Sequence, residues 1–207
     1  PSFTKGANQM VAEDAGAQTV TSWATGISAG PNEGGQTVFF EITDNTNPGL
    51  FSAGPSVSSA GTLTYTSAAN QNGSATITLR ATDDGGTGNG GVDASPTQTF
   101  DITVTAVNDA PVAQAKNYGA QANMKITGLG GLLSGVTDAD TGVNGCSPSF
   151  TVASVGPTTS PAGGIISNVN ASTGTFDFDP PPGVTGNVTF SYTVQDNGCP
   201  STATSAP

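Results

Sequence analysis

The side chains of this chain that could take part in chemistry are almost all carboxylates. The sequence holds 15 Asp and Glu residues against 4 Lys and Arg residues, has no histidine, and carries a formal net charge of −11 at pH 7. The absence of histidine removes the usual general base and the commonest transition-metal ligand. Clustered carboxylates are compatible with bound divalent cations, and the alternative is that the acidity only keeps the protein soluble. So few basic residues argue against nucleic acid or an anionic membrane surface as a partner.

Two of the carboxylates, Asp177 and Asp179, stand at alternate positions of a predicted strand. Alternate residues share one face of a strand, so the pair indicates a solvated strand face, with the acid pair of a glycosidase as the alternative. No pairing of Ser with Lys and no other catalytic constellation accompanies them. We therefore predict that the chain is not an enzyme and has no catalytic residues.

The two cysteines, Cys146 and Cys199, each follow a glycine in a turn-like segment. A disulfide between them would close a loop of 53 residues, worth roughly 3–4 kcal/mol in the chain-entropy model. Low Lys and Arg content with abundant Thr, Gly, Asn and Asp is typical of secreted bacterial repeat proteins. We therefore favour the disulfide over two free thiols.

An internal repeat organises the chain around these residues. The segment 61–66 returns at 174–179, and this offset of 113 residues continues without a gap through a strand–turn–strand unit that ends in an Asp-x-Gly loop. A period of about 100 residues is too long for a solenoid and indicates domains that fold independently. The repeat therefore predicts two tandem domains of one architecture.

Strand signals recur at short spacing, and no window shows a sustained helical period. Apolar and polar residues alternate within the strands, and 29 Gly and 14 Pro residues punctuate them. The predicted strands are 37–42, 61–65, 75–81 and 99–107 in the first copy, and 175–178 and 188–194 in the second. The fold class is all-β, with two tandem antiparallel β-sandwiches. Trp23 is predicted to be a core residue, with a lone carbohydrate-facing platform as the alternative.

The boundary between the domains is predicted at the segment 107–111, Val-Asn-Asp-Ala-Pro. A strand ends there, Asn and Asp favour a turn, and Pro fixes the restart of the chain. The predicted domains are residues 1–108 and 109–207.

The end of the second domain differs from that of the first. Asp196 matches Asp83 in the repeat, but only a short Ser-, Thr- and Ala-rich stretch follows it. We expect the second domain to lack its final strand and to leave an open sheet edge. The start at Pro1 and this end are typical of a segment cut from a longer protein.

Several short motifs then fall into a known order. Residues 108–111 resemble the Asp-x-Asn-Asp-Asn-x-Pro linker of cadherin repeats, and residues 138–145 resemble the cadherin Asp-x-Asp-x-Gly-x-Asn-Gly loop. Residues 81–86 and 194–198 resemble the cadherin Ala-x-Asp-x-Gly segment, and residues 12–14 resemble the acidic part of its first strand. Nearly the whole chain thus resembles tandem cadherin-like or immunoglobulin-like repeats of large bacterial extracellular adhesins.

The resemblance implies a calcium site at the junction between the domains. Calcium takes six to eight oxygen ligands, and in cadherins they converge from two domains because no single loop supplies enough. The ligands implied here are Glu13, Asn108, Asp109, Asp138, Asp140, Asn144 and Asp196. Calcium bound to them would stiffen the linker.

The sequence departs from the cadherin pattern at three places. Residues 69–73 carry no acid where the pattern has Asp-Arg-Glu, Ala106 replaces the first Asp of the linker, and residues 30–34 replace the Asp-x-Asp loop of the first domain. These departures favour one ion or none over a triple-calcium junction. The alternative for Asp138 and Asp140 is ordinary turn capping by their side chains.

These observations predict a structural or adhesive repeat segment that acts as a rigid spacer in a bacterial surface protein, outside the cell. The expected partners are neighbouring repeats or identical subunits, with a surface or carbohydrate ligand as a further class. One alternative is a subunit of an extracellular filament assembled by strand donation to the open edge. Another is an accessory carbohydrate-binding module of a secreted enzyme. No membrane insertion is expected, because the apolar runs are far short of a span.

Overall fold

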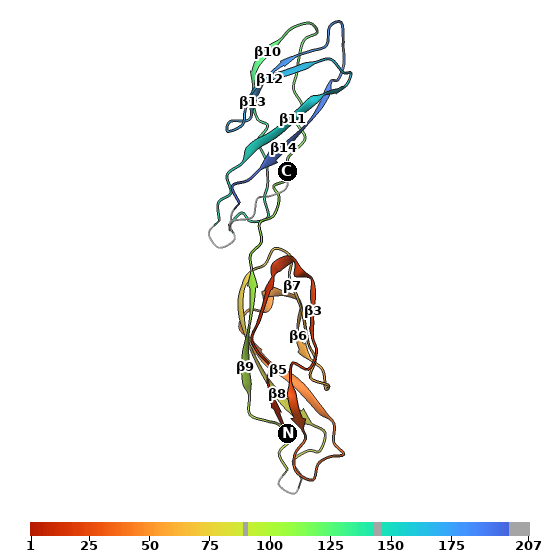
Figure 1. Ribbon diagram of the computed structural model, residues 1–207, viewed down its shortest axis with the longest axis vertical. Coiled ribbons are helices and arrows are strands. Elements are labelled where there is room, and N and C mark those ends of the chain that lie inside the picture. Colours follow the sequence, from red (N-terminus) through yellow and green to blue (C-terminus); the bar gives the residue numbers. More distant parts are fainter. Residues whose placement is uncertain (89–90, 143–145, 199–207) are drawn as a thin grey trace. The chain divides into compact units, whose positions relative to one another are not determined.

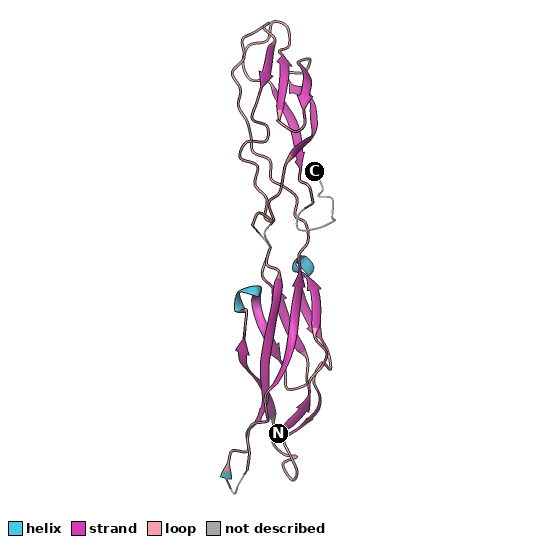
Figure 2. Ribbon diagram, turned by 90° about the vertical axis from the view of Figure 1, so that its left-hand side faces the viewer, coloured by secondary structure: helices cyan, strands magenta, loops and turns pink. Residues whose placement is uncertain are grey.

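The computed structural model describes residues 1–88, 91–142 and 146–198 of the chain (Figure 1). The chain divides into two compact units, Pro1–Val107 and Asn108–Pro207, called the first and the second unit below. Strands make up the regular structure of both units, apart from short 3-10 turns, so the predicted all-β class is confirmed (Figure 2). No helix within the described ranges is long and apolar enough to cross a membrane.

One sheet of the first unit has four strands. Their order is β2 (Gln9–Ala12), β9 (Gln98–Thr105), β8 (Gly73–Asp83) and β5 (Val38–Asn45). β8 pairs antiparallel with both of its neighbours, whereas β2 runs parallel to β9. β9 therefore lies inside the sheet, with β8 on one side and β2 on the other.

The remaining strands of the first unit form two smaller antiparallel sheets. One has the order β3 (Ala17–Val20), β7 (Leu63–Ser67), β6 (Phe51–Val57), and the other pairs β1 (Ser2–Thr4) with β4 (Thr25–Ser28). Two 3-10 turns, η1 (Glu13–Ala15) and η2 (Pro48–Leu50), precede β3 and β6.

The core of the first unit forms between its sheets because alternate side chains of a strand point to one face. Trp23 is buried there, with its ring centroid 4.4 Å from that of Phe100, and its Nε1 donates a hydrogen bond to the Ala7 carbonyl at 2.9 Å. The prediction that Trp23 is a core residue is confirmed. The inward side chains of β8 and β9 are at most 2% exposed, namely Ala75, Ile77, Leu79, Ala81, Phe100, Ile102 and Val104.

The described residues of the second unit form two antiparallel sheets. The order of the first is β10 (Ile126–Leu129), β13 (Thr175–Asp179), β12 (Ile165–Asn170). The second sheet pairs β11 (Thr151–Ser160) with β14 (Thr189–Gln195). In the part of the chain that the structure describes, β14 pairs with β11 alone.

The core of the second unit is smaller than that of the first. The buried apolar side chains of its cluster are Leu132, Val152, Phe176 and Phe178. The Phe176 ring packs edge-on against two others, with its centroid 5.2 Å from that of Tyr118 and 5.5 Å from that of Phe190. The apolar side chains that pack against this cluster, among them Phe190 and Tyr192 of β14, are half-buried, whereas Val194 of β14 is 3% exposed.

The predicted solvated face around Asp177 is wrong, because this carboxylate is buried. One of its oxygens accepts the Gly128 N–H of β10 at 2.9 Å, and the other accepts the Asn168 side-chain amide of β12 at 2.7 Å. The Lys125 ammonium lies 3.4 Å from the second oxygen. The Gly128 N–H, the Asn168 amide and the Lys125 charge together hold the pKa of Asp177 below its ordinary value. Asp177 thus joins three strands of one sheet.

Candidate cation-binding site

The Asp138 side chain closes the turn that carries Asp138 and Asp140. Asp138 Oδ1 accepts the backbone N–H of Asp140 at 2.8 Å, and the Asp138 carbonyl accepts the Thr141 N–H at 3.3 Å. This is the Asx turn that Asp favours, because its short side chain reaches the backbone two residues on. The turn uses Oδ1 of Asp138, so turn capping by this residue does not exclude its Oδ2 as a ligand.

Asp140 ties this turn to the beginning of the second unit. Its side chain is 2% exposed, and its Oδ2 accepts the backbone N–H of Asp109 at 2.8 Å. Burial of a carboxylate is costly unless hydrogen bonds compensate it, so this contact fixes the position of residue 109.

Asp196 and Asn108 complete the cluster. The Asn108 side-chain amide donates to Asp196 Oδ2 at 3.3 Å and to the Asp109 carbonyl at 3.1 Å. Asp196 Oδ1 accepts the Gly198 N–H at 2.7 Å, which closes the Asp-x-Gly loop noted in the sequence. The structure therefore gathers Asn108, Asp109, Asp138, Asp140 and Asp196, which we call the oxygen cluster, within the second unit.

The oxygen cluster concentrates negative charge. The pKa of the Asp138 carboxyl is raised above its ordinary value, chiefly by burial. The hydrogen bond from the Asp140 N–H opposes this increase, and the negative charges of Asp140 and Asp196 add to it. Two buried oxygens, Asn108 Oδ1 and Asp138 Oδ2, receive no hydrogen bond from any described residue. Repelling carboxylates and oxygens without donors suit a hard cation, which takes oxygen ligands only.

The side chains of the cluster do not yet form a complete coordination shell. Within residues 1–88, 91–142 and 146–198, no set of three or more Asp, Glu, Cys or His side chains is placed as metal ligands are. The carboxylate and amide oxygens are therefore ligands that calcium accepts, but in this structure they are arranged to hold turns together and not to surround an ion.

The other two predicted ligands are Glu13 and Asn144. Glu13 belongs to η1 of the first unit and is 3% exposed, and its Oε1 accepts the Val107 N–H at 2.7 Å. Asn144 lies outside the described residues. Asn108, Asp109, Asp138, Asp140 and Asp196 are thus the predicted ligands that the structure brings together.

Cys146 is buried and disulfide-bonded. Its predicted partner, Cys199, lies outside the described residues, so the pairing itself stays a prediction. The Cys146 carbonyl accepts the Gly142 N–H at 2.8 Å.

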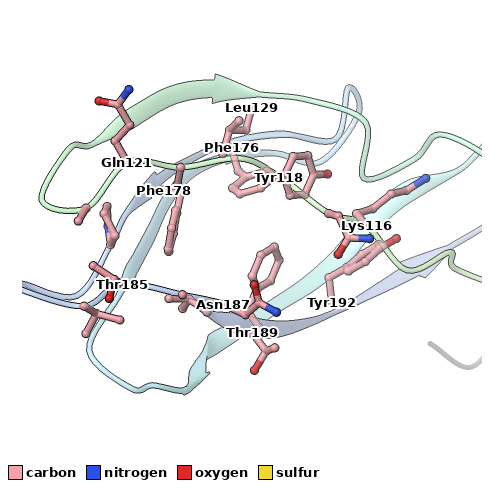
Figure 3. Close-up of a pocket in the computed structure, with 18 of the residues that line it drawn as sticks. Lys116, Tyr118, Gln121, Leu129, Phe176, Phe178, Thr185, Asn187, Thr189 and Tyr192 are labelled. Carbon is pink, nitrogen blue, oxygen red and sulfur yellow. The ribbon is translucent and has the colours of Figure 1, made fainter.

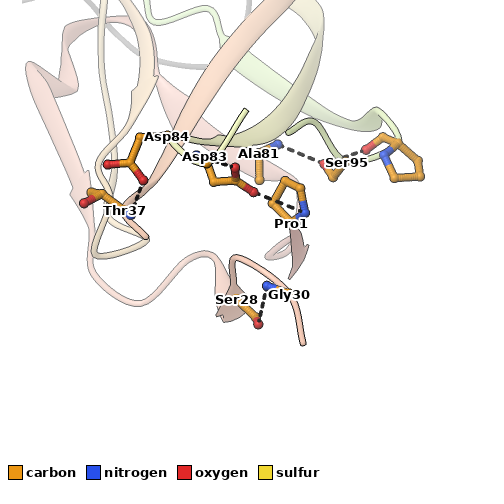
Figure 4. A network of polar contacts seen from close by, with 10 residues as sticks. Pro1, Ser28, Gly30, Thr37, Ala81, Asp83, Asp84 and Ser95 are labelled. Atoms are coloured by element: carbon orange, nitrogen blue, oxygen red, sulfur yellow. Dashed lines mark hydrogen bonds and ion pairs between the residues drawn. The ribbon is translucent and has the colours of Figure 1, made fainter. Parts of the chain in front are cut away.

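The first unit uses its corresponding carboxylates differently. Asp83, the repeat counterpart of Asp196, accepts the Gly85 N–H at 3.1 Å and lies 3.6 Å from the amino nitrogen of Pro1 (Figure 4). The neighbouring Asp84 accepts the Thr37 N–H at 2.8 Å. Asp83 thus closes a local turn and lies near Pro1, and Asp84 holds Thr37, whereas the first copy of the repeat has no Asp-x-Asp motif.

A cavity in the second unit was not foreseen from the sequence. It has a volume of about 430 Å³ and lies between residues 115–122 and β14, with aromatic side chains of β13 at its base. Figure 3 shows Tyr118 and Phe176 on one side of it, and Asn187 and Tyr192 on the other. No signal in the sequence around residues 115–122 indicated it.

Comparison with known proteins identifies the second unit. Residues 108–206 match the family model described as bacterial cadherin-like domain. The second unit is a bacterial cadherin-like domain. The oxygen cluster therefore belongs to a cadherin-like domain, and the predicted resemblance is confirmed for this part of the chain. The 113-residue repeat links the first unit to the same architecture.

Comparison with solved structures finds, among others, two similar chains. One is the crystal structure of human CDH23 EC21-23, which is 18% identical to this chain, with a TM-score of 0.44. The match covers 95% of this chain and 66% of the CDH23 chain. The other is an endo-fucoidan hydrolase of glycoside hydrolase family 107, which is 14% identical to this chain, with a TM-score of 0.35. The match covers 98% of this chain and 27% of the hydrolase chain. The chain thus spans less than two thirds of the length of either protein. No curated protein sequence matches it.

Proposed function

We propose that this chain is a structural or adhesive segment of a bacterial surface protein, in which cadherin-like domains serve as a rigid extracellular spacer. Each unit has its own buried core, and the second is a bacterial cadherin-like domain. Domains of this kind span distance and present a surface, a role that requires no catalytic site. The proposed partners are neighbouring repeats or identical subunits.

The observation that carries the proposal is how the backbone is held on each side of the junction. The last N–H of the first unit, that of Val107, is held by Glu13 of the same unit at 2.7 Å. The N–H of Asp109 is held by Asp140 of the second unit at 2.8 Å. Between these two anchored residues stands Asn108 alone, and its side chain is itself bonded to Asp196. A connection with so few free torsions supports stiffness, whereas a flexible linker needs many unconstrained residues.

Calcium binding at the oxygen cluster is the second part of the proposal. Asp138, Asp140, Asp196 and Asn108 would hold the ion, and the family resemblance adds Glu13 and Asn144 to this set. Bound calcium would supply positive charge where burial and the neighbouring carboxylates raise the pKa of Asp138. The same residues anchor the Asp109 N–H, so an ion that orders them would also order the start of the second unit.

Small-angle X-ray scattering tests the spacer. Three glycines inserted between Asn108 and Asp109 are expected to broaden the distribution of interatomic distances, because they separate the two anchored N–H groups. The same insertion between Gly34 and Gly35, in an exposed turn of the first unit, is the matched control and should leave the distribution unchanged. If the junction insertion changes nothing, the natural junction is already flexible and the spacer role is wrong.

Calorimetric titration with calcium tests the ion separately. A single site with a dissociation constant of about 10⁻⁴–10⁻³ M is expected, as in extracellular calcium modules. Asp138→Asn should abolish the heat, because the amide keeps the Oδ1 acceptor of the turn but removes the charge. Asp179→Asn, in the same unit and outside the cluster, should bind calcium as the wild type does. No heat from the wild type would reject the calcium site and leave the spacer untouched.

A further inference from the structure

The dipeptide Asn-Gly occurs four times in the sequence, and two of the four, Asn72-Gly73 and Asn197-Gly198, lie within the described residues. An asparagine that precedes glycine can react with its own backbone, because glycine has no Cβ to hinder the approach of its nitrogen. The glycine nitrogen attacks the side-chain amide carbon of the asparagine, and a five-membered imide forms. The contacts of this nitrogen and of the amide oxygen therefore decide how readily each site reacts.

At the second site, a carboxylate holds the attacking nitrogen. Asp196 Oδ1 accepts the Gly198 N–H at 2.7 Å, a hydrogen bond to a charged acceptor. Such an acceptor takes up the proton while the nitrogen forms its new bond, which is the role of a general base. The φ of Gly198 is +70°, a conformation that glycine adopts without steric cost. Asp196 is thus placed to activate the Gly198 nitrogen.

A backbone donor polarises the amide that this nitrogen would attack. Asn197 is exposed, and its Oδ1 accepts the Ser149 N–H at 3.1 Å. Negative charge develops on this oxygen during the attack, and an N–H that already points at it stabilises the charge, as in an oxyanion hole. A base, a nucleophile and an oxyanion donor therefore surround one side-chain amide.

The first copy of the repeat shows that a carboxylate fits at this position. The offset of 113 matches Asn197 to Asp84. Asp84 Oδ1 accepts the Thr37 N–H at 2.8 Å, and this contact corresponds to the one between Asn197 and the Ser149 N–H. An aspartate at position 197 would therefore keep the contact that the asparagine makes.

We infer that Asn197 is a self-modification site, at which the side-chain amide becomes a carboxylate through an intramolecular imide. The Gly198 nitrogen bonds to Cγ and passes its proton through Asp196 to the leaving nitrogen, so the Cγ–Nδ2 bond breaks and ammonia departs. Water then opens the imide at either carbonyl and leaves aspartate or isoaspartate at position 197. The product adds one negative charge next to Asp196 of the oxygen cluster, and the reaction depends neither on calcium nor on the spacer role.

The other described Asn-Gly pair is an internal control. Asn72 is half-buried, and Gly73 begins β8, where it lies opposite Val104 of β9. The sheet holds this backbone extended, so ring closure at Asn72 requires the start of the strand to open. The same dipeptide therefore stands in two different settings within one chain.

Peptide mapping by mass spectrometry measures both sites in one sample. The native full chain is kept at neutral pH with chelator, and the change in mass from amide to acid is followed over time. Asn197 is expected to convert at least about tenfold faster than Asn72. In urea the rate at Asn197 should fall to that at Asn72, because unfolding removes the contacts of Asp196 and Ser149. Equal rates at the two sites of the native chain, or faster conversion of Asn197 in urea, would overturn the inference.

A variant of the full chain tests the base. Asp196→Asn keeps a side-chain oxygen for the Gly198 N–H but removes the charge, so conversion of Asn197 should slow at least about tenfold. Asp179→Asn, in the same unit and outside the oxygen cluster, is the matched control and should convert as the wild type does. An unchanged rate in Asp196→Asn would refute the assigned mechanism. If circular dichroism shows that this variant unfolds, Ser149→Pro, which removes the donor N–H, replaces it with the same expectation.

Discussion

Glu13 of η1 holds the backbone just after β9, and the structure indicates how much stability is lost when its side chain is removed. The carboxylate is 3% exposed, and Oε1 lies 2.7 Å from the Val107 nitrogen. A hydrogen bond to a charged acceptor is worth about 1.5–3 kcal/mol, and Glu13→Ala leaves the N–H without this acceptor. A loss of about 2 kcal/mol lowers the melting temperature of a unit of this size by roughly 8–16 °C.

Tryptophan fluorescence reads this change in the first unit alone. The chain has 1 tryptophan, and Trp23 is buried in the core of that unit. Glu13→Gln keeps a carbonyl oxygen as acceptor, so a smaller decrease is expected. Asp14→Ala removes the exposed neighbouring carboxylate of η1 and should melt as the wild type does. The reasoning fails if Glu13→Ala melts within about 1 °C of the wild type, because the bond would then contribute almost nothing.

Three further outcomes are expected. The lowered pKa of Asp177 gives the second unit stability that is complete above the ordinary carboxyl value of 3.8 and is lost as pH falls through the folded pKa. Acid unfolding followed by tyrosine fluorescence should therefore be less steep in Asp177→Asn, and an unchanged slope would contradict this assignment. Gly61→Ala should destabilise the first unit by about 1–2 kcal/mol or more, because φ is +80° and the new Cβ would lie 2.1 Å from a backbone oxygen. Gly34→Ala, with no atom near its Cβ, is the control, and equal denaturant midpoints of the two would refute the argument. Mass spectrometry without reductant should find no alkylatable thiol at Cys146 or Cys199, and two modified thiols would disprove the predicted disulfide.

Much of the fold was predictable because the alternation of apolar and polar residues is a local pattern and the repeat shows the same pattern twice. The segment predicted at 75–81 lies within β8, and that predicted at 188–194 nearly coincides with β14. The short strand β10 carries little alternation of its own and forms because β13 offers it an edge. Alternation also failed at Asp177: it assigns a residue to one face of a strand, but it does not say that Gly128 and Asn168 cover that face.

The oxygen cluster was predictable as a set of residue types and less so as a set of contacts. The turn formed by Asp138 is local, so residue type and spacing indicate it. The bond from Asp140 to the Asp109 N–H joins residues 31 apart, and the bond from Glu13 to Val107 joins residues 94 apart. Contacts of this separation depend on how sheets pack, which one sequence does not reveal.

The claim that the chain is a calcium-stiffened spacer is tested most directly by the rotational diffusion of its two units. Nitrogen-15 relaxation of backbone amides gives a diffusion tensor for each unit in the same sample, with calcium or with chelator. A rigid spacer requires that in calcium both units report one common, slow and anisotropic tensor. Two tensors in calcium, each with the correlation time of an isolated domain of about 100 residues, would contradict the account.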